Sequence, residues 1–132
     1  MIESRWLRLS FLVGFMGLIY VFSGNEVPPM VLHAEVGSGL PMGNLVHIGA
    51  YAILGALVYW SVMGLGRFEW RLVVVVVFCV VYGASDELHQ GFVTGRDGSV
   101  FDVALDGLGS LLTIVGLVVI KMRRGSSPSG EL

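Results

Sequence analysis

Four long apolar stretches dominate the pattern of hydrophobic and polar positions along the chain. They cover residues 6–22, 45–65, 72–92 and 100–120. A helix needs about 20 mostly apolar residues to cross the hydrocarbon core of a bilayer. The pattern therefore predicts an all-α fold, a four-helix transmembrane bundle with these ranges as its helices. We expect one membrane domain over residues 1–124 and a disordered tail, rich in Ser, Gly and Pro, over residues 125–132.

The third apolar stretch is interrupted by polar residues before it is long enough to span. Residues 72–85 are all apolar or small, but as a helix they would extend only about 21 Å, less than a hydrocarbon core of about 30 Å. The helix must therefore continue through residues 86–90, which read Asp-Glu-Leu-His-Gln. This predicts that polar side chains lie inside one leaflet of the membrane.

Two other stretches carry small or polar residues at helical spacing. In the fourth stretch these are Asp102, Asp106, Gly109, Thr113 and Gly116. In the first stretch they are Ser10, Gly14 and Gly17. Small-residue stripes let membrane helices pack closely, so we expect both stripes to face neighbouring helices. In the connection over residues 24–43, Pro28 and Gly37 predict one or two helical turns.

Charge divides the chain into two sides. Of the 8 basic residues, seven would share one side of the bundle: Arg5, Arg8, Arg67, Arg71, Lys121, Arg123 and Arg124. The other side would carry most acids and the three histidines, including His33. Lys and Arg mark the cytoplasmic side, so we expect cytoplasmic N- and C-termini and an external polar side. A cleaved signal peptide is the alternative reading of the first stretch.

Composition excludes several classes of protein. A hydrophobic content of 55% with only 14% charged residues is outside the range of soluble domains. One cysteine, Cys79, excludes an internal disulfide and a cysteine-rich metal site. The net charge of -2 argues against nucleic acid as a partner.

Ionisable residues inside membrane helices normally point inward and pair with one another. Here they fall on three predicted helices at similar depth, which predicts one shared cavity. The residues expected to line it are His47, Tyr51, Asp86, Glu87, Gln90, Asp102 and Asp106, with Arg96 at its rim.

Several of these residues also have purely structural explanations. Ser99 and Asp102 fit a capping box at the start of the fourth helix. Asp86 could pair with Arg96, and His47 could donate to a backbone carbonyl. Asp106 lies beyond capping reach and must be neutral or paired, so we expect it to bond to Tyr51, His47 or Gln90.

The predicted cavity contains more negative than positive charge. Four carboxylates face Arg96, His47 and His89. Shared protons, a protonated histidine or a divalent cation would each relieve their repulsion. The spacing matches no specific metal motif, so a divalent cation stays open as a cofactor.

The segment from His47 to Gly109 resembles the VanZ-like family of small bacterial membrane proteins. The residues that carry this resemblance are His47, Tyr51, the run from Ser85 to Gln90, Gly95, Arg96, Asp102 and Gly109. The family usually has asparagine in place of Asp106, and Ser23 matches the serine that often closes its first helix. The resemblance implies a multi-helix envelope protein, and the family namesake is associated with low-level teicoplanin resistance.

These observations lead to one functional hypothesis and two alternatives. We expect a site in the outer half of the bacterial cytoplasmic membrane that binds or acts on an amphiphilic or lipid-linked envelope molecule. The catalytic candidates are His47, Asp86, Glu87 and Asp102; the binding candidates are Tyr51, Gln90, Arg96 and Asp106. The alternatives are a proton- or ion-coupled transporter and a structural or partner-binding protein. Whether the protein is an enzyme stays open.

Overall fold

A computed structural model of the chain describes residues 2–25, 42–93 and 98–125. These residues form helices and turns, and none of them forms a strand. The four helices are α1 (Ile2–Ser23), α3 (Met42–Ser61), α4 (Phe68–Gln90) and α5 (Val100–Gly125). Each is long and apolar enough to cross a membrane, which confirms the predicted all-α, four-helix class. The helical turns expected between Pro28 and Gly37 lie outside the described residues.

The helix ends differ from the limits of the apolar stretches. α3 ends at Ser61, four residues before the second stretch does, because Gly64 and Gly66 adopt positive φ angles of 89° and 57° in the turn that follows. α4 begins at Phe68, so Arg71 lies inside the helix and not before it. At its other end α4 continues to Gln90, as the length argument predicted.

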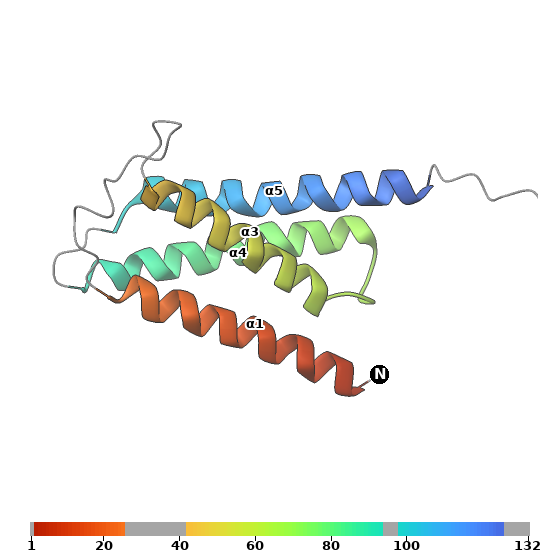
Figure 1. The fold of residues 1–132 in the computed structure, drawn as a ribbon, viewed down its shortest axis with the longest axis horizontal. Helices are drawn as coiled ribbons and strands as arrows, with labels where there is room; N and C mark the ends of the chain where they lie inside the picture. The colour runs from red at the N-terminus through yellow and green to blue at the C-terminus, as the bar shows by residue number, and fades with distance from the viewer. Residues whose placement is uncertain (1, 26–41, 94–97, 126–132) are drawn as a thin grey trace, which may run out of the picture.

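α3 and α4 each contact all three of the other helices, and α3 makes the more extensive contacts with α1 and α5. In Figure 1, α1 and α5 lie on opposite sides of α3 and α4. The first turns of α3 and α5 and the last turns of α1 and α4 share one end of the bundle (Figure 1). Polar residues from all four helices can therefore meet at that end.

The core lies between α1, α3 and α4, and its fully buried side chains include Leu54, Val58, Val75 and Cys79. α5 approaches α3 closely at Gly109, where a Cβ atom would clash with the carbonyl oxygen of Ile48.

The small and polar stripe on α5 faces its neighbour over most of its length. One turn beyond Gly109, the Thr113 hydroxyl donates to the carbonyl of Ala52 over 2.6 Å. Gly116 is exposed and has no neighbour within 4 Å of a built Cβ. The predicted stripe therefore faces α3 up to Thr113 and not beyond.

The stripe predicted on α1 does not face the bundle. Ser10, Gly14 and Gly17 are exposed, and a Cβ built on either glycine would meet nothing within 4 Å. The opposite face packs inward through Leu12, and the Met16 carbonyl accepts a 2.7 Å hydrogen bond from the Tyr82 hydroxyl. This expectation was wrong because a stripe of small residues does not reveal which face of a helix has a neighbour.

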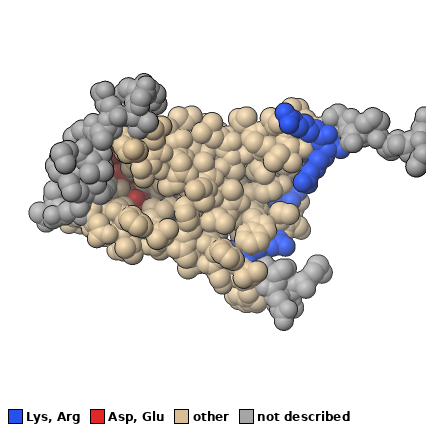
Figure 2. Space-filling model, in the orientation of Figure 1, with Lys and Arg blue, Asp and Glu red and all other residues tan. Residues whose placement is uncertain are grey.

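Charged residues separate along the bundle axis. In Figure 2, Lys and Arg lie at one end and the visible Asp and Glu atoms at the other. At the basic end, Arg8 donates to the carbonyls of Trp60 and Met63 over 3.4 Å each. The first turn of α1 and the last turn of α5 lie at this end (Figure 1). Which end faces the cytoplasm stays a prediction.

Candidate functional site

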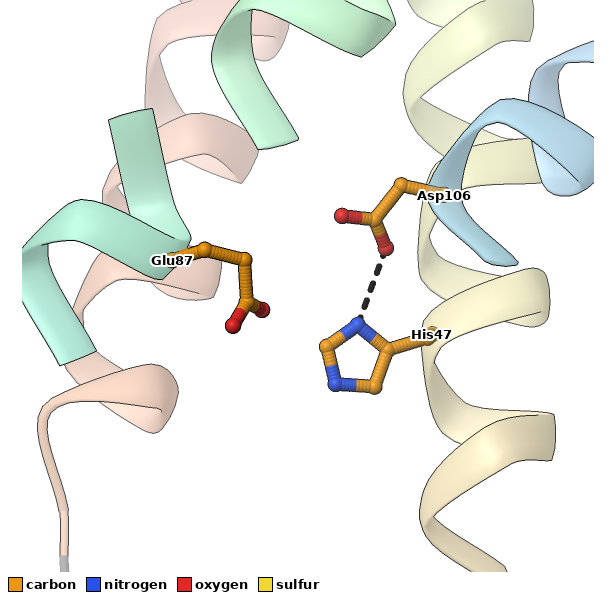
Figure 3. A group of neighbouring side chains, drawn as sticks. All are labelled: His47, Glu87 and Asp106. Atoms are coloured by element: carbon orange, nitrogen blue, oxygen red, sulfur yellow. Dashed lines mark hydrogen bonds and ion pairs between the residues drawn. The ribbon is translucent and has the colours of Figure 1, made fainter. Parts of the chain in front are cut away.

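Three ionisable side chains from three helices meet at the acidic end. His47 lies on α3, Glu87 on α4 and Asp106 on α5, and Figure 3 shows Glu87 pointing toward the other two. The His47 ring bonds through Nδ1 to Asp106 Oδ1 over 2.9 Å. One ligand-type atom from each of the three lies within 4.8 Å of the others. We call these three residues the His–Glu–Asp cluster.

Glycine allows the Asp106 carboxylate to sit against α4. A Cβ atom at Gly83 would lie 2.5 Å from Asp106 Oδ2, which is too close for any other residue. The Asp106 side chain is 1% exposed. Because Gly109 also brings α5 against α3, two glycine contacts hold this carboxylate between its neighbours.

A second set of hydrogen bonds joins α1 to the end of α4. The Ser23 hydroxyl donates to Asp86 Oδ1 over 2.6 Å, and Gln90 Nε2 donates to Asp86 Oδ2 over 3.0 Å. The same Gln90 amide lies 3.1 Å from Glu87 Oε1. Gln90 therefore links two buried carboxylates and fixes their positions relative to each other.

The start of α5 also holds Glu87. The backbone N–H of Ser99 donates to Glu87 Oε2 over 2.7 Å, while the Ser99 hydroxyl accepts from the N–H of Asp102 at 3.4 Å. Ser99 is therefore the predicted N-cap. In a capping box its own N–H would bond to the acid at the third helical position, Asp102. Here Glu87 from α4 accepts the hydrogen bond from the Ser99 N–H instead.

A cavity of about 300 Å³ opens between α1 and α3 beside these residues. Most of its wall is apolar, formed by Phe15, Leu18, Ile19, Phe22, Met42, Val46 and Ala50. Its polar side chains are Ser23, His47, Tyr51, Asp86 and Gln90. The cavity therefore combines apolar helix walls with a polar patch that belongs to the acidic end.

Two buried oxygen atoms have no hydrogen-bond partner among the described residues. They are the Tyr51 hydroxyl and Asp106 Oδ2, and both residues are almost completely buried, at 2% and 1% exposure. Buried polar atoms are normally bonded, so each unsatisfied one calls for an explanation.

Comparison with known proteins gives the family. Residues 4–121 match the model of the family described as VanZ/LLP1. The chain belongs to the VanZ/LLP1 family. No curated protein and no solved structure matches it. The match and the four apolar helices together make it a VanZ-like, multi-pass membrane protein.

In this VanZ/LLP1 family member, most of the predicted site residues lie together. Those at the His–Glu–Asp cluster, in the cavity or in the network beside them are His47, Tyr51, Asp86, Glu87, Gln90 and Asp106. Asp102 lies at the edge, on the first turn of α5, and is half-buried. Arg96 falls outside the described residues.

His89 does not join the acids. Its ring stacks on Tyr20 of α1, with ring centroids 4.1 Å apart and planes 20° from parallel. Of the histidines in the described residues, only His47 therefore faces the cluster. The sequence placed His89 beside Asp86 on the helix but could not show that α1 covers that side.

Little or nothing in the sequence indicated two parts of the site. Ser23 had only the family resemblance in its favour, yet it donates to Asp86. The cavity wall contributed by Phe15, Ile19 and Phe22 had no signal at all, because an apolar residue that lines a cavity has the same character as one that faces lipid.

Proposed function

We propose that this VanZ/LLP1 family protein binds an amphiphilic or lipid-linked molecule of the bacterial cell envelope in the cavity between α1 and α3. The observation that carries the proposal is the composition of that cavity, whose walls are apolar helix faces and whose polar side chains from α1, α3 and α4 lie at the acidic end. An acyl or prenyl chain suits the walls, and a polar head group suits the patch.

The polar patch offers both donors and acceptors to a head group. The Tyr51 hydroxyl is buried without a partner among the described residues, so a ligand oxygen or nitrogen would satisfy it. A cavity of about 300 Å³ is at the lower end of the usual range for small-molecule sites. It would therefore enclose a head group and the first part of a chain, with the remainder of the chain in the bilayer.

Charge asymmetry supports an outward-facing site in the bacterial cytoplasmic membrane. Basic residues favour the cytoplasmic side, which would leave the acidic end at the outer leaflet, where envelope precursors are used. Single cysteines in a Cys79→Ala background test this orientation. A membrane-impermeant maleimide should label Phe92→Cys, whose parent residue is 90% exposed at the acidic end, and should not label Gly125→Cys in intact cells. The reverse pattern would refute the orientation.

The apolar core makes a transport route less well supported. Leu54, Val58, Val75 and Cys79 are at most 1% exposed and occupy the bundle between the acidic network and the basic end. A purely structural role for the polar network is also less well supported, because a structural lock has no use for the buried Tyr51 hydroxyl, which lacks a partner among the described residues.

The proposal is for binding, and it leaves room for chemistry on the bound head group. His47 with Asp106 behind it would serve as an acid or a base. Asp86, Glu87 and Asp102 are the other candidates for such a role.

Photocrosslinking to the purified full-length protein tests the proposal. The probe is a diacyl phospholipid that carries a diazirine near its head group, with polyprenyl phosphate as competitor. We expect crosslinks to α1 and α3 residues that line the cavity. Ala50→Trp would fill the cavity and should weaken probe binding about tenfold, a loss of about 1.4 kcal/mol, which lowers crosslinking at sub-saturating probe concentrations.

Ala56→Trp is the matched control, because Ala56 lies on the same helix, is exposed and does not line the cavity. It should crosslink like the wild type. Equal crosslinking of both variants, with both folded, would refute binding in this cavity. Teicoplanin susceptibility of a bacterium that expresses each variant gives a cellular readout, since the family association concerns that antibiotic.

A further inference from the structure

We infer that the His–Glu–Asp cluster binds a first-row divalent cation such as Mn²⁺ or Zn²⁺. His47, Glu87 and Asp106 come from three different helices, and one ligand-type atom of each lies within 4.8 Å of the others. Ligands of a bound ion at about 2.0–2.2 Å from the metal are separated from one another by up to about 4 Å. Small side-chain rotations would therefore close the cluster around an ion.

The types of ligand select the class of metal. Magnesium and calcium prefer sets made of oxygen atoms alone, whereas an imidazole with carboxylates suits first-row transition metals. His47 Nδ1 and Asp106 Oδ1 lie 2.9 Å apart, a separation that two neighbouring ligands of one ion can have, so the ion would replace the hydrogen bond between them.

Glu87 is held in place by two hydrogen bonds that leave free lone pairs on its carboxylate oxygens. Its two oxygens accept bonds from the Gln90 amide, at 3.1 Å, and from the Ser99 N–H, at 2.7 Å. A carboxylate has about four lone-pair sites, so at least one remains on each oxygen. Figure 3 shows this carboxylate turned toward the His47–Asp106 pair.

The unsatisfied oxygens are independent evidence for a ligand. Asp106 Oδ2 is buried without a hydrogen-bond partner among the described residues, in a side chain that is 1% exposed. The Tyr51 hydroxyl, one helical turn after His47 and lining the same cavity, is unsatisfied too. A cation that carries bound water would relieve this, because the water would donate hydrogen bonds to such oxygens.

A proton on Asp106 is the competing explanation, and it accounts for less. Protonated Oδ2 would become a donor, but it has no acceptor among the described residues. It would also leave the Tyr51 hydroxyl unsatisfied. A cation would balance the negative charge of Glu87 and Asp106. Among the described side chains of the cluster, only His47 can carry a positive charge.

Metal titration of the purified, full-length protein tests this inference. After treatment with a chelator in detergent, MnCl₂ and ZnCl₂ are titrated separately by calorimetry, and bound Mn²⁺ is followed by electron paramagnetic resonance. We expect one ion per chain. Glu87→Gln and Asp106→Asn should each weaken binding by about tenfold or more. Asparagine keeps an acceptor for the His47 ring, so Asp106→Asn should remain folded even where Glu87→Gln does not.

Two control variants separate the cluster from other metal-binding groups. Glu69→Gln removes an exposed acid at the basic end, and His89→Gln removes the histidine that stacks on Tyr20. Both should bind like the wild type. Absence of binding to the folded wild type, or equal affinity of Asp106→Asn and Glu69→Gln, would refute the inference. The titration contains no lipid probe, so its failure leaves the proposed binding of an amphiphile to be decided by crosslinking.

Discussion

The two ends of the bundle differ in how deeply their charged side chains are buried. At the basic end, Arg67 and Glu69 form a 3.7 Å ion pair with side chains that are 90% and 64% exposed. At the acidic end, Asp86, Glu87 and Asp106 are only 5%, 6% and 1% exposed. Exposed ion pairs contribute little to stability, whereas buried charges are costly unless they are paired and hydrogen-bonded.

This difference separates two uses of charge within one small protein. Exposed bases such as Arg67 are suited to setting orientation in the membrane, which requires only that they stay on one side. The acids require specific partners, such as Ser23 for Asp86 and His47 for Asp106. Substitutions should therefore have large effects at the acidic end and small effects at the basic end.

The largest effect is expected where α5 touches α3. A Cβ atom at Gly109 would clash with the backbone of α3, so Gly109→Ala should lower the free energy of unfolding by about 3 kcal/mol. Gly116→Ala, on the same helix with nothing within 4 Å, is the control and should be neutral. Thermal unfolding in detergent, followed by circular dichroism, measures both. Equal melting temperatures would mean that α3 and α5 are not held in close contact.

The next effect is expected at Asp106. Asp106→Ala leaves the His47 ring without its partner and should lower the free energy of unfolding by about 2 kcal/mol. Asp106→Asn should be tolerated, because an amide oxygen still accepts from the ring. Glu69→Ala, at the exposed basic end, should leave the melting temperature unchanged. Equal melting temperatures of Asp106→Ala and Glu69→Ala would contradict the difference between the two ends.

A smaller effect is expected at Ser23. Its hydroxyl donates to Asp86 over 2.6 Å, and Ser23→Ala should lower the free energy of unfolding by about 1 kcal/mol. Ser10→Ala is the matched control, since Ser10 lies exposed on the same helix and its hydroxyl bonds locally to the carbonyl of Trp6. Differential scanning calorimetry of the two variants makes the comparison. A larger loss in Ser10→Ala would contradict it.

Replacement of Arg96 should have the smallest effect on stability, but it should still weaken binding of the lipid. By sequence it is the only Lys or Arg on the acidic side, so Arg96→Ala should weaken crosslinking to an anionic form of the diazirine phospholipid. The melting temperature should stay that of the wild type. Photocrosslinking with the anionic probe, and with a zwitterionic one as control, measures the loss. Unchanged crosslinking to both probes would remove Arg96 from the proposed site.

Much of the fold could be predicted because hydropathy and helix geometry are local properties. The continuation of α4 through Gln90 followed from length alone. The end of α3 could not be predicted in this way, because Met63 and Leu65 are as apolar as a helix interior while Gly64 and Gly66 turn the chain.

The site could be predicted in part, for a related reason. Periodicity puts His47 and Tyr51 on one face, and the cost of burying charge in a membrane turns that face inward. Periodicity does not show which neighbour covers a given side, so the stacking of His89 on Tyr20 could not be foreseen. The partner of Ser23, 63 positions away in Asp86, is likewise decided by tertiary packing.

The pairing of His47 with Asp106 has a consequence for how the protein is made. α5 leaves the ribosome after α3, and it carries its acid two turns from its start. α3 is synthesised about sixty residues earlier, so its imidazole is already in the membrane when α5 arrives. Correct insertion of the fourth span should therefore depend on the second, and a chain with His47→Leu should accumulate α5 outside the bilayer, where its acid stays hydrated.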